Sequence, residues 1–530
     1  MAPIFVGSEN ENSRVRSDRL GFAASTSDPG TAAEGDGYYN SSDNQLKFYD
    51  GSAWSAIQGS GSVELVASGT LANGQTVIVT SDGKVAGVAG SSITAAVGSV
   101  ETFDTSALNT SISRGTRSVY DASTNKIVTA YVMSSNAELK AVVSSINDTT
   151  PSFGTATSLG NRKQYPSIAC NGNGKVVVAY RDENNGDYGT AQVGTIDGTS
   201  ISFGTAVVFN SSNTQASTIV YDENADKFVI AYYDSGSART SAIVGTINGT
   251  SINFGTEVEM FSAVTGGIAS AYDPVLQKCV FFVMLYSSDD KAIVGTISGT
   301  SISFGTATTF STADAINTNV VYDSNSKKFI AVYEEDGSSD KLYAIVGTVS
   351  GTSISVGTKV ELTTSAVDYV AAAYDVQADK TLVAYRTSSN TGVFILLTTS
   401  GTTVTANSET QFVTSIHGTS AVYDESEKRV VISFRDDSVV QKAGRVRVVR
   451  NATTTTNLTT ENFIGFSDAA YSNGQTANIQ IISSVDDAQT GLTTGSLHYV
   501  QFDGSLSTTA GTPSVEAGTA LSDTKIRIKS

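Results

Sequence analysis

Apolar and polar residues alternate through the middle of this chain in short runs typical of β-strands. Residues 216–261 show one unit: ASTIVYD, the polar turn ENAD, KFVIAYYD, SAIVGTI, NGTS and INFGTEVEMF. ASTIVYD and KFVIAYYD are rich in β-branched and aromatic residues, and a polar turn led by Asp separates them. No useful length of helical periodicity interrupts the pattern. We therefore expect an all-β protein whose units each contain four strands, A to D.

One signal, Asp-x-x-x-x-Lys, marks the turn between strands A and B of each unit. Successive copies are 49 to 52 residues apart. The first position is held by Asp121, Cys170 (the lone substitution), Asp222, Asp273, Asp323, Asp375 and Asp424, and the last by Lys126, Lys175, Lys227, Lys278, Lys328, Lys380 and Arg429. A fixed period near 50 residues predicts a repeat architecture, in which each unit buries its apolar face against its neighbours.

Strands C and D are expected to form a tight hairpin through Asp-Gly, Asn-Gly or Ser-Gly turns, which need positive φ. In strand D a glycine recurs at one position: Gly154, Gly204, Gly255, Gly305 and Gly357. The sixth unit has Asn407 there. Because Asn is the best non-glycine occupant of left-handed backbone, we expect a β-bulge or kink of that kind at this position.

The seventh unit has no strand D of its own. Residues 97–103, VGSVETF, match residues 304–310, FGTATTF, position for position. A strand displaced to the front of the array makes sense only if the two ends of the array meet. We therefore predict a seven-bladed β-propeller with small accessory β domains at both ends of the chain. Residues 97–103 are expected to lie beside residues 445–450, as the outermost strand of the blade formed by residues 419–450.

The rest of the chain divides around this ring. We expect an extended N-terminal arm at 1–35, an aromatic β-hairpin attachment module at 36–60, and the first part of a small β domain at 61–90. The propeller then occupies 91–458, and residues 459–530 complete the small β domain. The hairpin is too short to bury a core alone, so another protein or a second copy should cover it.

The formal charge of −18 and the pI near 4.5 argue against nucleic acid and anionic membranes as partners. No apolar run approaches a membrane span of about 20 residues, and the N-terminus shows no secretory signal. Cys170 and Cys279 lie in different units, which argues against a disulfide and fits assembly in a reducing cytosol.

Three segments together carry a resemblance that covers most of the chain. GDGYYNSSDNQLKFYDGSAW resembles N-terminal modules in fibre proteins of tailed phages, and residues 489–529 resemble C-terminal modules of structural proteins in marine phages, including cyanophages. The units with KFVIAY and VGTISGTSISFGT are similar to repeats in phage tail proteins. The resemblance implies a virion surface or tail component, oligomeric and involved in host attachment, that contacts other virion proteins through its N-terminal module.

No catalytic constellation is evident, so we expect no enzyme, no cofactor and no metal. His417 and His498 belong to no pair that could hold a metal ion. The repeated Asp is explained by a turn in which its side chain bonds the backbone two residues on. Calcium binding by the acidic turns is the alternative, and Asp222 to Asp226 comes closest to the alternating oxygen ligands that it needs.

Binding residues are sought where the copies differ. The A–B and C–D turns are alike in all units, whereas the B–C and D–A loops, which should lie at the other end of the ring, vary. The candidate ligand-binding residues, at or just after the end of strand B, are Arg181, Tyr233, Tyr286, Arg386 and Arg435. Tyr suits stacking on a sugar and Arg suits carboxylate or sulfate. Salt bridges to Asp182, Asp234, Asp436 and Asp437 within the loops are the alternative.

We therefore expect a non-enzymatic virion protein, a tail fibre or capsid-surface appendage, that presents its propeller to a glycan or protein of the host surface. One alternative is a purely structural virion component whose propeller contacts other virion proteins. The other is a glycan depolymerase, which would require two or three carboxylates converging on the ring axis.

Overall fold

The structure, a computed structural model, describes residues 24–33, 36–42, 45–49, 51–56, 61–109, 115–286, 288–336 and 340–529. It is all-β, as predicted, with one short 3-10 helix among the described residues, Glu183–Asn185. The chain forms two compact units: the terminal unit, Met1–Ser92 with Thr454–Ser530, and the ring unit, Ile93–Thr453. Most of the predicted arm, including Arg14, Arg16 and Arg19, lies outside the described residues.

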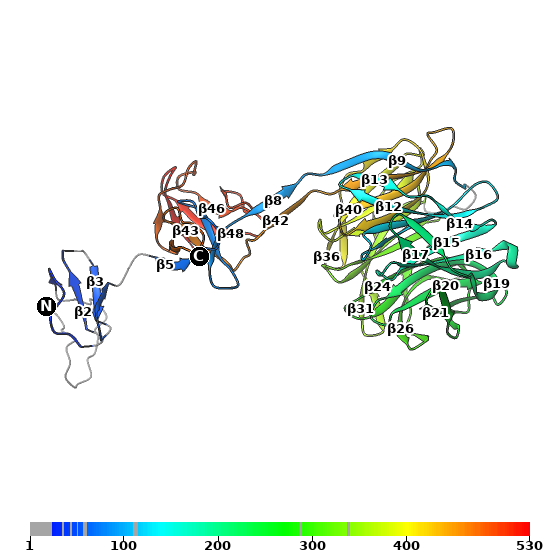
Figure 1. Cartoon of the computed structure of the whole chain (residues 1–530), viewed down its shortest axis with the longest axis horizontal. Coiled ribbons are helices and arrows are strands. Elements are labelled where there is room, and N and C mark those ends of the chain that lie inside the picture. Colours follow the sequence, from blue (N-terminus) through cyan, green and yellow to red (C-terminus); the bar gives the residue numbers. More distant parts are fainter. Residues whose placement is uncertain are drawn as a thin grey trace. The chain divides into compact units, whose positions relative to one another are not determined.

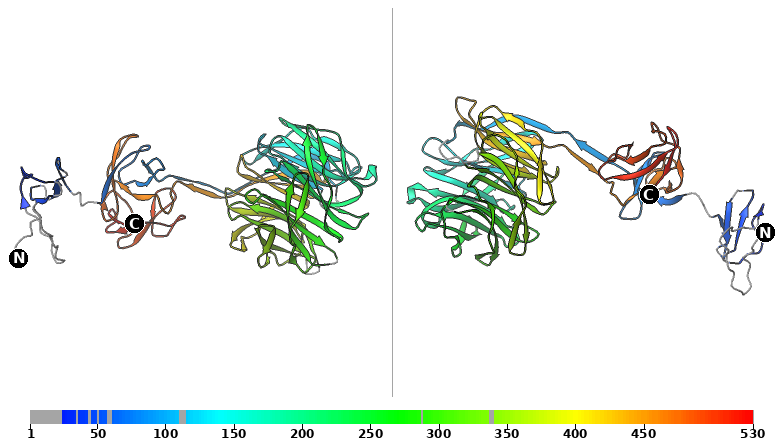
Figure 2. Two further views of the ribbon diagram at one scale, coloured as in Figure 1. Left: turned by 90° about the horizontal axis from the view of Figure 1, so that it is seen from below. Right: turned by 180° about the vertical axis from the view of Figure 1, so that it is seen from behind.

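Sheets of the ring unit follow one another in sequence order, from cyan to orange in Figures 1 and 2. Their first strands are β10 (Thr116–Asp121), β15 (Lys163–Cys170), β19 (Val207–Asp222), β24 (Thr265–Asp273), β29 (Ala315–Asp323), β34 (Val367–Asp375) and β39 (Ile416–Asp424). Their second strands are β11 (Lys126–Val132), β16 (Lys175–Asp182), β20 (Lys227–Asp234), β25 (Lys278–Leu285), β30 (Lys328–Glu335), β35 (Lys380–Thr387) and β40 (Arg429–Asp436). Each pair is antiparallel, and an Asp-led turn joins the two strands in every pair except β15 and β16.

Third strands pair with the second strands, and two short outer segments usually complete each sheet. The third strands are β12 (Leu139–Asn147), β17 (Tyr188–Asp197), β21 (Arg239–Asn248), β26 (Asp290–Ser298), β31 (Lys341–Ser350), β36 (Gly392–Ser400) and β41 (Ala443–Arg450). The outer segments are β13 (Thr150–Phe153) with β14 (Thr157–Gly160), β18 (Ser200–Phe203) with the start of β19, β22 (Ser251–Phe254) with β23 (Val258–Phe261), β27 (Ser301–Phe304) with β28 (Thr308–Ser311), β32 (Ser353–Val356) with β33 (Val360–Glu361), and β37 (Thr403–Ala406) with β38 (Thr410–Val413).

The last sheet takes its outer strand from the start of the ring unit. β9 (Ala96–Ala107) pairs antiparallel with β41, with Thr102 opposite Arg445 and Val97 opposite Val449. In Figure 1 this blue strand lies beside the yellow and orange strands of the last sheet. This is the pairing that the sequence predicts.

The apolar core lies between neighbouring sheets. Each second strand is a nearly continuous buried run, such as Val229 to Tyr232 in β20, because both of its faces meet another sheet. One cluster joins Val128 and Ala130 of β11 to Val176 and Val178 of β16.

A further core cluster joins the first and last sheets. Tyr131 and Val142 pack with Val431 and Val446, and Phe103 of β9 belongs to the same cluster. The first strands β10 and β39 also lie in contact. The sheets therefore close into a ring.

The repeated glycine of strand D corrects one sequence expectation. Its position does coincide with an irregularity, because the outer strand is interrupted there and resumes with a one-residue shift in pairing. However, neither Gly204 nor Asn407 has the predicted positive φ. A Cβ at Gly154, Gly204, Gly255, Gly305 or Gly357 would instead overlap the carbonyl oxygen of the threonine in the C–D turn of the next sheet. Close approach of two backbones, and not left-handed geometry, excludes a side chain here.

The described part of the terminal unit contains three sheets. The first is β1 (Ala24–Ser25), β2 (Gly37–Asn40), β3 (Gln45–Tyr49) and β4 (Trp54–Ala56). The second has the order β5 (Ser62–Val66), β44 (Thr476–Gln480), β43 (Phe463–Ser467), β6 (Thr76–Val79) and β7 (Val85–Gly87). The third has the order β45 (Val485–Asp486), β49 (Ile526–Ile528), β48 (Val515–Ala520), β46 (Leu497–Val500) and β47 (Leu506–Ser507). The second sheet joins strands from before and after the ring unit. A two-stranded ribbon, β8 (Gly90–Ile93) with β42 (Thr453–Thr456), lies where the chain passes between the units.

Candidate functional site

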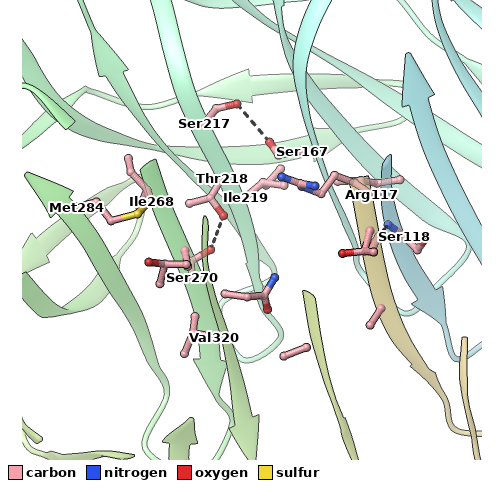
Figure 3. Close-up of a pocket in the computed structure, with 18 residues that line it drawn as sticks. Arg117, Ser118, Ser167, Ser217, Thr218, Ile219, Ile268, Ser270, Met284 and Val320 are labelled. Atoms are coloured by element: carbon pink, nitrogen blue, oxygen red, sulfur yellow. Dashed lines mark hydrogen bonds between the residues drawn. The ribbon is translucent and has the colours of Figure 1, made fainter. Parts of the chain in front are cut away.

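A cavity of about 230 Å³ lies among the first strands of the ring unit, on the axis of the ring. Residues of β10, β15, β19, β24, β29, β34 and β39 all contribute to its wall. Its polar groups are mainly hydroxyls. Thr218 and Ser270, from neighbouring sheets, are 2.9 Å apart (Figure 3), and the backbone N–H of Ser118 donates to Ser420 Oγ at 2.9 Å.

The only charged side chain among the described residues of this wall is Arg117. In Figure 3 it reaches from β10 towards the middle of the cavity, and its Nη1 donates to the carbonyl of Thr116 at 2.8 Å. Neither Asp nor Glu is among the described lining residues. The converging carboxylates that the depolymerase alternative requires are therefore not found in the wall of this cavity.

The end of the ring at which the first strands begin and the second strands finish borders this cavity, since Met284, near the end of β25, belongs to its wall, and we name this end the mouth. At the seventh position of each second strand the residues are Val132, Arg181, Tyr233, Met284, Glu334, Arg386 and Arg435. Four of the five predicted binding residues thus occupy one structural register, at one end of the ring. The fifth, Tyr286, lies just beyond β25 and is 63% exposed. Its ring lies over Gly266, where a Cβ would be 2.8 Å from it.

The Arg181 side chain contacts residues of its own sheet. Its Nη2 donates to Gln164 Oε1 at 2.7 Å and lies 3.2 Å from Glu183 Oε1, and its guanidinium lies 5.1 Å from the centre of the Tyr165 ring. Tyr165 has φ of 52°, at an irregularity in β15 where the pairing with β16 shifts. The side chain of Arg181 is 14% exposed.

Arg386 repeats this arrangement in another sheet and joins a larger cluster. Its guanidinium lies 4.6 Å from the ring centre of Tyr369, which also has left-handed φ, and its Nη2 pairs with Asp368. The Tyr369 ring in turn packs 4.8 Å from the ring of His417. His417 Nδ1 is 3.0 Å from Asp437 Oδ2. Burial lowers the pKa of His417, and the nearby carboxylate of Asp437 opposes that shift.

Arg435 and Tyr233 depart from the prediction of an exposed binding residue. Arg435 is 2% exposed, with its Nε 2.7 Å from Asp437 Oδ1 and its Nη1 donating to the carbonyl of Leu108 at 3.3 Å. Tyr233 is 7% exposed. The second strands are covered by neighbouring sheets up to their ends, and the strand pattern alone does not reveal how far this cover extends. The salt-bridge alternative accordingly describes Arg435 best.

Glu334 belongs to the mouth but was missed by sequence reasoning. It is 2% exposed and accepts a hydrogen bond from Asn317 Nδ2 at 2.8 Å. Burial raises its pKa to about 7, and the nearby charge of Asp368 adds to the shift. Glu334 is the seventh residue of its second strand, as Arg181 and Arg386 are of theirs, and this shared position in the repeat could have identified it from the sequence.

The opposite end of the ring is uniform. The Oδ1 of Asp222, Asp273, Asp323, Asp375 and Asp424 accepts the backbone N–H groups two and three residues on. This is the turn geometry that the structural interpretation predicts. No group of three or more His, Cys, Asp and Glu side chains in the described part of the chain is arranged to hold a metal ion.

The second unit corrects the alignment of this turn. Asn171, and not Cys170, takes the place of the aspartate, because Asn171 Oδ1 accepts the N–H groups of Asn173 and Lys175. The turn is one residue shorter, with left-handed Gly172 and Gly174. Cys170 takes the place of the tyrosine that precedes each aspartate. Its Sγ donates to the carbonyl of Tyr120, and burial raises the pKa of this thiol to about 12.

Comparison with solved structures identifies the architecture. The chain is similar to the BP39L lectin from Burkholderia pseudomallei, with a TM-score of 0.50 and 10% identity over 64% of this chain and 98% of the lectin. The ring is a β-propeller. A second similar structure is the β-propeller domain of Cps50 from Myceliophteria thermophila, with a TM-score of 0.42 and 7% identity over 63% of this chain and 96% of that domain.

At these identities the likeness concerns the fold alone. No protein-family model and no curated protein matches the chain. Within the described residues there is no helix with the length and apolar character needed to cross a membrane.

Proposed function

We propose that this chain is a structural protein of a tailed-phage virion, in a tail fibre or capsid-surface appendage, and that its propeller contacts the host surface through the mouth of the axial cavity. The observation that carries the proposal is the contrast between the two ends of the ring. One end repeats an Asp-led turn in every unit but the second, which has an Asn-led turn, whereas the register at the other end carries Val, Arg, Tyr, Met, Glu, Arg and Arg in successive sheets. Uniform positions maintain a scaffold, and positions that differ on a rigid scaffold are suited to recognition.

We infer that the propeller has seven blades, the last completed by β9. Asn407 supports this count. It stands where the other blades have glycine, and the blade that follows it has no C–D turn because its outer strand is β9. Gly98 of β9 packs as the repeated glycines do, since a Cβ there would overlap the carbonyl oxygen of Thr149 in the first sheet. The sheets of the terminal unit would then form the accessory β domains.

A purely structural role is the second candidate, and the ion pairs at the mouth favour it. Arg181, Arg386 and Arg435 all have carboxylate partners within the chain. A guanidinium that is already paired recognises an external carboxylate or sulfate only by exchanging partners, which reduces the net gain.

Adsorption of the phage to its host separates the two candidates. Purified full-length protein added in excess should slow adsorption if the propeller contacts the host. The Arg181→Ala, Arg386→Ala double variant should lose this competition. Arg239→Ala serves as the control, because Arg239 is 52% exposed and pairs with Glu259 at 3.3 Å. Unchanged adsorption in the presence of wild-type protein would support the structural role. Antibody labelling of intact virions in the electron microscope tests the virion assignment itself.

A further inference from the structure

The charged residues in the wall of the axial cavity differ from those of the chain as a whole. The formal charge of the chain is −18, yet the described residues of the cavity wall include one guanidinium and no carboxylate. A single cationic group inside an acidic protein creates a local potential that attracts anions.

Hydroxyl groups around this charge supply hydrogen-bond donors. When Thr218 and Ser270 bond to each other at 2.9 Å, one hydroxyl hydrogen is used in the pair and the second can point elsewhere. Ser167 and Ser217 form a longer pair at 3.5 Å. Both pairs appear as dashed lines around the end of Arg117 in Figure 3. A guanidinium with several hydroxyl donors is the group that oxyanions require, because each oxyanion oxygen accepts hydrogen bonds.

The size of the cavity suits a small guest. Its volume of about 230 Å³ is well above the ~10–15 Å³ that one water molecule requires by this kind of measure. At the mouth, the carboxylates of Asp368 and Asp437 are paired with Arg386 and Arg435, so their repulsion of an entering anion is reduced.

We propose that the axial cavity binds a small oxyanion, with Arg117 as the charged ligand group and the hydroxyls of Thr218 and Ser270 as donors. The bound group is either a free inorganic oxyanion or the acidic group of a sugar. Both have the same chemistry at the site. This inference concerns the cavity alone and does not rest on a virion role.

Isothermal titration calorimetry of the full-length protein in chloride buffer tests the proposal, with sodium sulfate, sodium phosphate, glucuronate and neutral glucose as probes. We expect one site per chain for at least one of the three anions and none for glucose. Binding of sulfate or phosphate alone identifies a free oxyanion as the guest, whereas tighter binding of glucuronate identifies a sugar acid. Absence of binding by all three anions, or equal binding of glucose and glucuronate, overturns the proposal.

Variants place the site. Arg117→Gln keeps hydrogen-bond donors but removes the charge, and it should weaken anion binding 10-fold or more, while Arg239→Gln should leave it unchanged. Undiminished binding in Arg117→Gln refutes the assignment. Should Arg117→Gln fail to fold, Ser270→Val, which removes a hydroxyl and retains Arg117, takes its place. A 10-fold loss is again expected, and retained affinity again refutes the assignment.

Discussion

Gly204 lies against the backbone carbonyl of Thr250 in the next sheet, with no room between them for a Cβ atom. The same relationship recurs from sheet to sheet and sets how closely neighbouring blades approach. Gly204→Ala should therefore lower the free energy of unfolding by about 1–3 kcal/mol, the usual cost of overpacking. Ser202→Ala is the control, since Ser202 is an exposed residue of the same strand, β18. Equal stability of the two variants in urea unfolding would contradict the packing role of Gly204.

Ring closure depends on β9. A fragment of residues 93–453 contains this strand, and a fragment of residues 108–453 lacks it. The shorter fragment should melt at a much lower temperature, because it exposes the edge of β41 and loses Phe103, whose ring packs 4.9 Å from that of Tyr131. Circular dichroism on heating measures the difference. Matching melting temperatures would show that the ring does not need β9.

Replacement of Arg435, which is 2% exposed, should destabilise the protein more than replacement of Arg181, whose side chain is 14% exposed. Arg435→Gln leaves the Asp437 carboxylate without the guanidinium 2.7 Å away and should cost about 3–5 kcal/mol. Arg181→Gln should cost less than about 1 kcal/mol. The double variant Arg435→Gln, Asp437→Asn should recover part of the loss, since no unpaired charge remains. Chemical denaturation of the four proteins checks the order, and an Arg435→Gln variant as stable as wild type would exclude this account.

Glu334 should make the stability of the ring unit depend on pH. Its pKa rises from 4.5 to about 7 on folding, so the folded chain binds a proton more tightly than the unfolded chain. The stabilisation that proton binding to Glu334 gives the folded state is fully present below about pH 4.5 and is lost as the pH rises through about 7.

Glu334→Gln, which mimics the protonated form, should therefore stabilise the protein at pH 8 relative to wild type, by on the order of 2 kcal/mol. At pH 4.5 the two proteins should be nearly equal. Glu361→Gln is the control, since the Glu361 side chain is 41% exposed. An unfolding free energy for Glu334→Gln that tracks wild type at both pH values would disprove the assignment.

The terminal unit should be the part of the chain through which copies of the protein associate. The short sheet of β1 to β4 packs Tyr38, which is 3% exposed, edge-on against Trp54 at 4.8 Å. A sheet of this size is marginally stable alone, so we expect it to pack against another protein or a second copy. Sedimentation velocity should show a monomer for residues 93–453 and a larger species for the full-length chain. A full-length monomer would rule out self-association and leave docking to another protein.

The sequence by itself determined the local structure and the order of the strands. Asn248-Gly249 and its equivalents need positive φ, which a glycine in the turn supplies, and Gly249 has φ of 64°. The Asp-led turns follow because a carboxylate reaches its own backbone two or three residues on. The displaced strand at 97–103 could also be placed, since its pattern matches a strand D that the last unit lacks. All these features depend on neighbours in the chain or on comparison between copies.

Only the tertiary structure decided what the ends and axis of the ring contain. The cavity wall gathers one or a few residues from each first strand, and nothing within one repeat marks Arg117 or Ser270 as neighbours. The burial of Arg435 and the raised pKa of Glu334 depend on side chains of adjacent sheets. The role of Gly204 depends on a carbonyl 46 residues away in the next sheet, at Thr250. Periodicity fixes which residues share a register, but burial and charge at that register depend on the packing of one sheet against the next.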